Sequence, residues 1–259
     1  MKPKALILFA PGTNRDRDVA VALELAGAEP VVLPLKQLRE EEVDWAAFQI
    51  LVIPGGFSYA DALGAGKLFA FDLLHYFDDQ VQSFVAAGKP VIGICNGFQT
   101  LVKAGILPEP RSDGAPPAAT LTFNASNHFE CRWVSLQPSS QRCIWTRGLT
   151  RAIDCPVAHG EGNFQVSEPA AARSLFAAAQ VALVYAHPDG RPAQGQYPLN
   201  PNGSVLDVAG VCNPAGNVLG LMPHPENNVF PFQSPDRARR PDHSGLPLFA
   251  NGVRYAGAC

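Results

Sequence analysis

The sequence predicts an α/β fold, a doubly wound open sheet with mixed strands. In the first 105 residues, short runs of uninterrupted apolar residues alternate with helical patterns. Runs without a polar–apolar alternation are typical of strands buried on both faces, as in a parallel sheet. The second half changes to closely spaced strand-like segments with turn residues between them, which indicates mixed or antiparallel additions to the sheet.

Strands and helices are expected in alternation in the first part of the chain. Pro11-Gly12 closes the first apolar run. Each helical pattern stops at a glycine, because glycine readily adopts the left-handed conformation that ends a helix. The expected strands are Ala5–Ala10, Pro30–Leu35, Phe48–Ile53 and Pro90–Ile94, and the expected helices are Arg15–Ala26, Gly97–Ala104 and one or two helices within Leu68–Ala87.

The second half is expected to add six strands and a closing helix. The strands are expected near 120–123, 128–136, 155–158, 180–186, 204–210 and 217–222, and the helix over Leu246–Tyr255. Two loops stand out by composition, the proline-rich segment 109–119 and the locally basic segment 231–245. Because no internal repeat or linker interrupts the pattern, a single domain over residues 1–259 is expected.

Composition and charge argue against several classes of protein. The 20 Lys and Arg against 23 Asp and Glu give a net charge of −3, so no basic face for nucleic acid is expected. No stretch approaches 18 uninterrupted apolar residues, so no membrane span is expected, and the N-terminal run is too short for a secretory signal.

The six cysteines show no C-x-x-C spacing, and no histidine pair has the spacing of a zinc site. We therefore expect reduced thiols, no metal and a cytoplasmic location. The inert core thiols are expected to be Cys131, Cys143, Cys155 and Cys212, which lie in strand-like segments.

The strongest local signal is V-I-G-I-C-N-G-F-Q at residues 91–99. An apolar strand leads into Gly93, Cys95 and Gly97, and a helical pattern follows, as in a nucleophile elbow with cysteine in place of serine. The glycines are expected because side chains there would collide with neighbouring backbone. The dipole and the free N–H groups at the N-terminus of a helix favour the thiolate form of a cysteine placed there. Taken alone, the motif is also compatible with a buried core cysteine before a glycine-rich turn.

A second signal is L-G-L-M-P-H-P-E at residues 219–226. Pro225 holds the segment extended, so His224 and Glu226 project the same way. A histidine in this arrangement can act as the base for a thiol while the carboxylate orients it. A surface His–Glu pair in a loop is the alternative for this motif alone. Together with the cysteine elbow, it predicts a Cys95–His224–Glu226 triad.

A third signal is I-P-G-G-F-S-Y-A-D-A-L-G-A-G-K at residues 53–67. The strand ends in Gly55-Gly56, whose N–H groups no side chain shields. The N–H groups of Gly56 and of Asn96, the residue after the nucleophile, are expected to form an oxyanion hole. A phosphate-binding loop is excluded, because Leu68 follows Gly66-Lys67 where Ser or Thr is required. A wide turn capped by the following helix is the remaining alternative.

These motifs resemble those of class I glutamine amidotransferases, and more narrowly the glutaminase components of phosphoribosylformylglycinamidine synthase. GICNGFQ, the PGG turn and MPHPE carry the wider resemblance, and FSY-x-D, FECRW and NPNGS carry the narrower one. The resembling blocks, in order, are PGTNRDRD (11–18), GGFSYADALGAGK (55–67), NASNHFECRW (124–133), AHGEGNF (158–164), YPLNPNGS (197–204) and GLMPHPE (220–226). The resemblance covers nearly the whole chain.

The resemblance implies an α/β domain that frees ammonia from L-glutamine, with Cys95 as nucleophile, His224 as base and Glu226 orienting the base. It places Gln99, Phe129 and Arg132 near the glutamine. It also places His159 in the active-site wall or in a partner contact. A packed loop histidine is the alternative for that residue.

The resemblance further implies a separate partner, a formylglycinamide ribonucleotide synthetase subunit that binds ATP and Mg. No cofactor is expected in this chain, because it carries no ATP-binding signal. A small accessory subunit is a further expected partner of the family. Because loop 231–245 directly follows the triad, we expect it near the active-site mouth or the partner interface.

Two other functions would keep part of this pattern. A class I amidotransferase could serve another acceptor in nucleotide, tryptophan or cofactor synthesis, but FECRW and FSY-x-D argue against this. The chain could also be a non-enzymatic partner with an inert triad. The intact Cys, His and Glu argue against that alternative.

Overall fold

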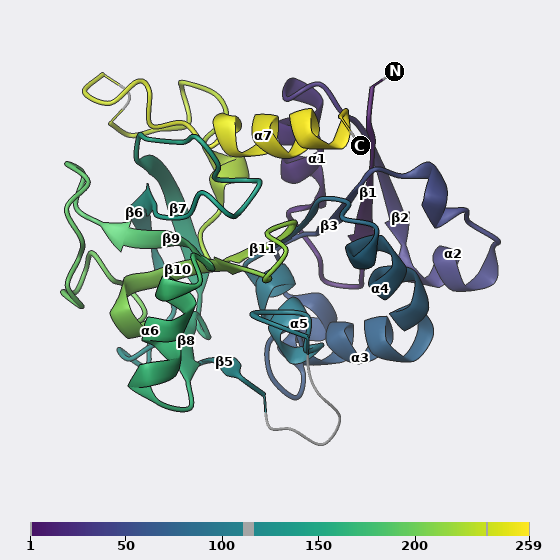
Figure 1. Ribbon diagram of the computed structural model, residues 1–259, viewed down its shortest axis with the longest axis horizontal. Coiled ribbons are helices and arrows are strands. Elements are labelled where there is room, and N and C mark those ends of the chain that lie inside the picture. Colours follow the sequence, from purple (N-terminus) through teal and green to yellow (C-terminus); the bar gives the residue numbers. More distant parts are fainter. Residues whose placement is uncertain (1, 111–116, 237, 259) are drawn as a thin grey trace.

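The computed structural model describes residues 2–110, 117–236 and 238–258. A nine-stranded mixed sheet runs through it in the order β2-β1-β3-β4-β11-β10-β9-β6-β7 (Figure 1). This confirms the fold class predicted from the sequence, an α/β open sheet with mixed strands. The predicted loop 109–119 falls largely on residues 111–116, which lie outside the described ranges.

The first half of the sheet is parallel, and all of its strands except the edge strand β2 are mostly or fully buried. Its strands are β1 (Lys4–Phe9), β2 (Glu29–Pro34), β3 (Ile50–Ile53), β4 (Val91–Ile94) and β11 (Val218–Leu221). Every residue of β3, β4 and β11 is buried, as uninterrupted apolar runs predict. Strand β11 comes from late in the chain and pairs with β4.

The remaining strands pair antiparallel, as the change in pattern predicted. The sheet continues with β10 (Val208–Cys212), β9 (Val181–Ala186), β6 (Glu130–Pro138) and β7 (Ile153–His159). A separate two-stranded ribbon is formed by β5 (Ala119–Thr122) and β8 (Asn163–Val166).

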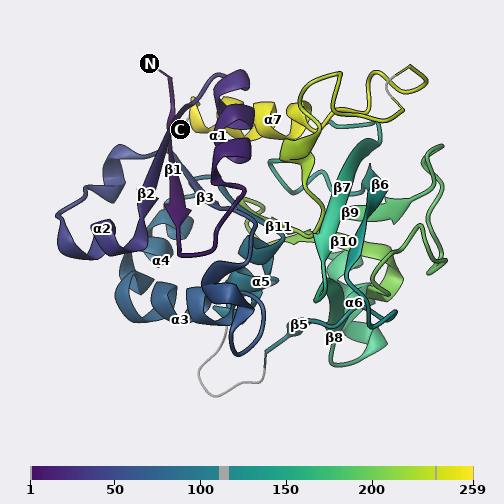
Figure 2. The same cartoon turned by 180° about the vertical axis from the view of Figure 1, so that it is seen from behind.

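Helices cover both faces of the parallel part. On one face lie α1 (Asp16–Leu25) and α7 (Leu246–Ala256), and on the other lie α3 (Lys67–Tyr76), α4 (Asp78–Ala86) and α5 (Asn96–Lys103) (Figures 1 and 2). The other helices are α2 (Leu35–Glu40) and α6 (Pro169–Ala177). Within the described ranges, no helix has the length and apolar character needed to cross a bilayer.

Several elements differ from the sequence prediction. The strand expected over Pro30–Leu35 ends at Pro34, and Leu35 begins α2, which the prediction lacks. The prediction of a strand over 204–210 is wrong for its first half. Leu206 and Asp207 have positive φ and belong to a 3-10 turn that precedes β10. The prediction also lacks β8 and α6. These elements are short, and an apolar period of two or 3.6 residues barely repeats within them.

The expectation of inert core thiols is wrong for Cys131, which is exposed on β6. Successive strand residues face opposite sides, and there Glu130 takes the buried side. Cys143 is buried but lies in an irregular segment and not in a strand. Cys155 and Cys212 are buried on β7 and β10, as expected.

Loop 231–245 is anchored on the antiparallel part of the sheet. The Arg240 guanidinium contacts Asp154 on β7 at 3.1 Å and Asp236 at 2.7 Å. The imidazole of His243 lies 3.2 Å from the second oxygen of Asp154. Because Asp154 is buried, its carboxylate requires hydrogen-bond partners, and the Arg240 and His243 side chains that supply them anchor the loop.

Helix α5 lies close against the sheet because two glycines leave room for it. A Cβ on Gly97 would overlap the carbonyl oxygen of Ile53, and a Cβ on Gly93 would lie 2.7 Å from the carbonyl oxygen of Gly97. Both positions therefore require glycine, as the elbow motif predicted.

Replacing Gly97 by Ala is expected to lower the free energy of unfolding by about 1–3 kcal/mol, because the added methyl group forces the helix away from β3. Chemical denaturation measures the loss. Gly257→Ala is the matched control, since its new methyl group would lie at ordinary contact distances, 3.6 Å or more, from its nearest neighbours and the residue has an ordinary φ. Equal stabilities of the two variants would contradict this packing.

Candidate active site

Cys95 lies at the turn between β4 and α5. Its φ of 51° and ψ of −106° belong to a sparsely populated region for a residue with a Cβ. Its N–H donates to the carbonyl oxygen of Leu221 at 2.8 Å, which fixes the turn against β11. This is the strained strand–turn–helix geometry that the G-x-C-x-G motif predicted.

His224 and Glu226 lie at the same edge of the sheet as Cys95. Strands β4 and β11 are parallel neighbours with Ile94 opposite Leu221, so the residues that follow both strands emerge side by side. His224 Nδ1 lies 2.6 Å from Glu226 Oε1, and both side chains are buried. The side chains of Cys95 and His224 lie beside each other, since a Cβ on Gly55 would lie 2.7 Å from His224 Cε1 and 3.4 Å from Cys95 Cβ. The structure thus brings the three predicted residues together.

The charges of these three groups depend on one another. Burial by itself lowers the pKa of His224, but the Glu226 carboxylate and the Cys95 side chain outweigh it and raise the pKa to about 10. At neutral pH the imidazolium form of His224 is therefore favoured. Glu226 Oε1 holds the ring, while Oε2 is buried and finds no hydrogen-bond partner among the described residues.

Two backbone N–H groups beside Cys95 are available to bind an anion. Within residues 2–110, 117–236 and 238–258, the N–H groups of Gly56 and Asn96 donate no hydrogen bond. Gly56 has a φ of +145° and packs on the backbone of residues 12–14, which leaves no room for a side chain. The Asn96 side chain accepts from the Ser58 hydroxyl and donates to Asp61 at 3.0 Å. These bonds fix the position of the second N–H group.

A cavity of about 140 Å³ opens beside Cys95. Gln99 and Phe129, two of the three residues expected near glutamine, line it. Arg132 does not line it, because its guanidinium pairs with the Glu130 carboxylate at 2.7 Å and with the Tyr197 hydroxyl at 2.6 Å. The lining residues are Gly56, Phe57, Asp61, Ala65, Cys95, Gln99, Phe123, Phe129, Ala158, His159, Gly160 and Glu161.

No described residue of loop 231–245 is among those that line the cavity. The loop therefore contributes nothing to the cavity wall from its described part. Its expected place in a partner interface stays a prediction.

Sequence reasoning did not single out two carboxylates in the wall, Asp61 and Glu161. Burial, and then the negative charge of Glu161, raise the pKa of Asp61. Lys103 lies 3.8 Å from Glu161 and balances one of the two charges. The wall therefore keeps an excess of negative charge. In the sequence, the positions of Asp61 in the FSY-x-D block and of Glu161 in the HGEG block were the signal that could have identified them.

His159 is a neutral ring packed in the wall. Asn124 Nδ2 donates to the carbonyl oxygens of His128 and His159 at 2.9 and 2.8 Å, so Asn124 Oδ1 must be the acceptor that faces His159 Nδ1 at 3.1 Å. His159 Nδ1 therefore carries the hydrogen. Burial, assisted by the nearby His224, lowers the pKa of His159 to about 3. The resemblance implied a place for His159 in the active-site wall or in a partner contact, and in the structure His159 lies in the wall.

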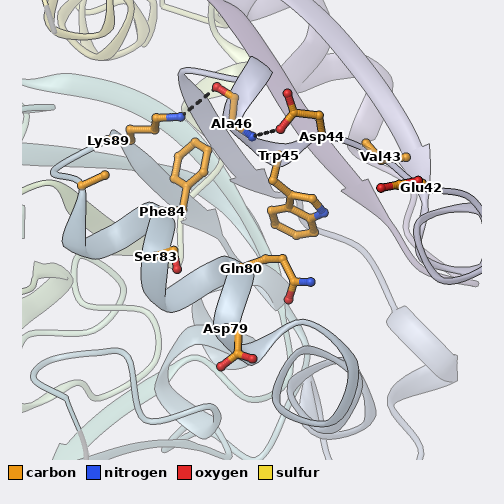
Figure 3. Close-up of a pocket in the computed structure, with 11 residues that line it drawn as sticks. Glu42, Val43, Asp44, Trp45, Ala46, Asp79, Gln80, Ser83, Phe84 and Lys89 are labelled. Carbon is orange, nitrogen blue, oxygen red and sulfur yellow. Dashed lines mark hydrogen bonds between the residues drawn. The ribbon is translucent and has the colours of Figure 1, made fainter.

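A larger cavity of about 800 Å³ lies between α4 and the turn that precedes β3. Figure 3 shows Trp45 and Phe84 there, near Asp44. Lys89 is already engaged, since it donates to the Ala46 carbonyl oxygen at 3.2 Å. The lining includes no cysteine or histidine. The start of β3 and the end of β4 lie at opposite edges of the sheet, so this cavity is remote from Cys95.

Comparisons with known proteins match nearly the whole chain. The CobB/CobQ-like glutamine amidotransferase domain family matches residues 2–256. The phosphoribosylformylglycinamidine synthase subunit PurQ of Treponema denticola is 58% identical, over 98% of this chain and 99% of that one. The PurQ subunit of Dehalococcoides mccartyi is 40% identical over 98% of each chain. A chain in the structure of PurLQS from Thermotoga maritima is 31% identical, with a TM-score of 0.75 over 98% of this chain and 99% of that chain.

An NMR titration of the His224 ring is expected to find it protonated well above the ordinary histidine pKa of about 6.5. Glu226→Gln removes the larger raising interaction, so burial then dominates and the pKa of His224 falls. Cys95→Ala removes the other raising interaction and also lowers the pKa of His224. A ring that is neutral at pH 7 in the unchanged protein would contradict the proposed charge state.

Proposed function

The chain belongs to the CobB/CobQ-like glutamine amidotransferase family and, within it, to the PurQ subunits of phosphoribosylformylglycinamidine synthase, and we propose that Cys95, His224 and Glu226 release ammonia from glutamine for a synthetase partner. The membership confirms the resemblance seen in the sequence blocks. The observation that carries the proposal is the placement of the His224–Glu226 pair beside Cys95, which lines one small cavity, next to two backbone N–H groups with no partner in the described ranges.

The reaction begins with attack by the Cys95 thiolate on the side-chain amide carbon of glutamine. The carbonyl oxygen becomes an oxyanion, which the N–H groups of Gly56 and Asn96 stabilise. The protonated His224 gives its proton to the amide nitrogen, the C–N bond breaks, and ammonia leaves. A glutamyl thioester on Cys95 remains.

Hydrolysis of the thioester completes the cycle. His224, now neutral, takes a proton from water, and the resulting hydroxide attacks the thioester carbon. The C–S bond breaks, glutamate leaves, and the thiolate returns beside the imidazolium. Glu226 keeps the ring oriented through both halves, since its hydrogen bond to Nδ1 leaves Nε2 for the proton transfers.

Glutamine carries a positive ammonium group at its other end. The excess negative charge of Asp61 and Glu161 suits that group. Both carboxylates lie in the same wall as Gln99, whose side chain donates to the Glu161 carbonyl oxygen at 2.7 Å. We therefore assign the ammonium end of glutamine to this side of the cavity.

The partner in this proposal is a formylglycinamide ribonucleotide synthetase subunit. The relatives are named as subunits of a synthase, and the structural neighbour is named PurLQS. ATP and Mg would bind to the synthetase, which would use the ammonia to make formylglycinamidine ribonucleotide. A small accessory subunit would complete the assembly.

Replacing Cys95 by Ala is expected to abolish glutamine-dependent synthesis by the complex but to leave ammonia-dependent synthesis unchanged, because only the nucleophile is lost. Parallel assays with glutamine and with an ammonium salt measure the two activities. If both activities disappear although the complex still forms, the proposed division of labour is wrong.

Replacing Glu161 by Gln is expected to raise the KM for glutamine by about 10- to 100-fold, because a charge-assisted hydrogen bond is lost. The effect on kcat should be smaller, since the reacting atoms lie at the other end of glutamine. Steady-state kinetics measure both. Glu42→Gln, in the remote cavity, is the control. An unchanged KM would show that Glu161 does not bind glutamine.

A further inference from the structure

Four hydrogen bonds fix the orientation of the Asn124 side chain. Its Nδ2 donates to the carbonyl oxygens of His128 and His159, at 2.9 and 2.8 Å, and its Oδ1 accepts from the Gly162 N–H at 2.9 Å. Turning the amide over would oppose donor to donor and acceptor to acceptor at these three contacts. The fourth contact, between Oδ1 and His159 Nδ1 at 3.1 Å, is therefore a bond that the histidine donates. These bonds use the whole donor and acceptor capacity of the amide.

The other ring nitrogen of His159 is a buried acceptor without a donor. Because the hydrogen is on Nδ1, the Nε2 atom carries a lone pair. The residue is 3% exposed, and its Nε2 has no hydrogen-bond partner in the part of the chain that the structure describes. An unpaired buried acceptor is unfavourable in the free protein, so it calls for a functional explanation.

The lone pair on His159 Nε2 is directed away from Asn124. In an imidazole ring, the lone pair of one nitrogen points away from the N–H bond of the other. The Nδ1–H bond points to Asn124, which is buried and does not line the active-site cavity, whereas His159 does line it. The side of the ring that carries Nε2 is therefore the side that is left to face the cavity.

The surroundings of His159 keep this acceptor neutral and in place. A Cβ on Gly162 would lie 2.4 Å from His159 Cε1, so only a glycine lets the backbone pack this closely on the ring. Burial, assisted by the charge of His224, lowers the pKa of His159 to about 3. The ring therefore stays neutral at neutral pH, and Nε2 keeps its lone pair.

The end of β7 brings His159 beside the reacting groups. The carbonyl oxygen of Ala158, the preceding residue, lies 3.7 Å from Cys95 Sγ. Earlier on the same strand, the carbonyl oxygen of Pro156 accepts from the His224 N–H at 2.8 Å. One strand end thus contacts both the nucleophile and its base, and under the proposed function the scissile bond of glutamine lies between these two groups.

We propose that His159 Nε2 accepts a hydrogen bond from the N–H of the glutamine side-chain amide and so selects an amide as the group that is cleaved. This inference rests on the proposed function and deepens it by assigning the specificity of the same site. The N–H groups of Gly56 and Asn96 are assigned to the amide oxygen, so the amide nitrogen is the end that still needs a partner. A primary amide nitrogen has two hydrogens to donate, whereas a carboxylate or ester oxygen has none. Sites that bind a substrate N–H in this way discriminate strongly against analogues that lack it.

The same hydrogen bond would orient the leaving group. When Cys95 attacks, the amide nitrogen becomes tetrahedral, and its new lone pair must face the protonated His224. A hydrogen bond from one N–H to His159 limits rotation about the C–N bond and keeps the lone pair in that direction. Because the pKa of His159 is low, the ring holds the N–H without removing its proton. The nitrogen therefore keeps both hydrogens, receives the third from His224 and leaves as ammonia.

Glutamate γ-methyl ester is the substrate that tests the proposal. Cys95 can attack its ester carbon and form the same glutamyl thioester as with glutamine, but the methoxy group that leaves has no N–H. His159→Asn keeps a polar side chain beside Asn124 and places no acceptor at the position of Nε2. In this variant, the ratio of kcat/KM for glutamine to kcat/KM for the ester is expected to fall by about 10- to 100-fold. Glutamate release by the complex with the synthetase subunit measures both values.

His159→Gln is the matched control, because its longer side chain can place an amide oxygen near the position of Nε2. It should keep more of the preference for glutamine than His159→Asn. The ratio does not depend on how much of a variant folds, so a partial loss of stability does not obscure the result. An unchanged ratio in His159→Asn, even with both activities lowered, would show a structural role and overturn the proposal. Release of glutamate from neither substrate by the unchanged complex would refute the proposed function itself.

Discussion

The parallel pairing of β4 with β11 is the constraint on which the candidate site depends. It places Ile94 opposite Leu221, so that Cys95 and the segment carrying His224 leave the sheet at one edge. The hydrogen bond from the Cys95 N–H to the Leu221 carbonyl oxygen extends this register by one residue. Two segments from distant parts of the sequence therefore meet with little freedom. The position of the nucleophile beside its base follows from that register.

The surrounding structure supplies what the register alone does not. Burial alone would favour the neutral form of His224. The carboxylate of Glu226 and the side chain of Cys95 outweigh burial and favour the protonated form. Within the described ranges, the N–H groups of Gly56 and of Asn96, the residue after Cys95, donate no hydrogen bond. Tyr59, Ala60, Asp61, Leu63 and Cys95, which all have a positive φ, lie in this region, and such strain recurs at functional sites.

Sequence reasoning predicted the parts that depend on local rules. The glycines around Cys95 and the buried parallel strands follow from steric and periodic patterns that a few residues define. The Asp61–Glu161 pair could not be predicted in this way, because their proximity arises from contacts between separate elements. Arg132 was placed near glutamine through its block, but the neighbouring Glu130 and Tyr197 hold its guanidinium elsewhere. Exposure of Cys131 depends on strand register, which composition does not define.

The central claim is that Cys95 is the nucleophile for glutamine, and labelling with a glutamine-like electrophile tests it most directly. Mass spectrometry of the treated protein, followed by peptide mapping, locates the adduct. Our account predicts one adduct, on Cys95, whose formation glutamine slows and which the exposed Cys131 does not share. An unlabelled Cys95, or labelling of Cys95 that glutamine leaves unaffected, would contradict the account.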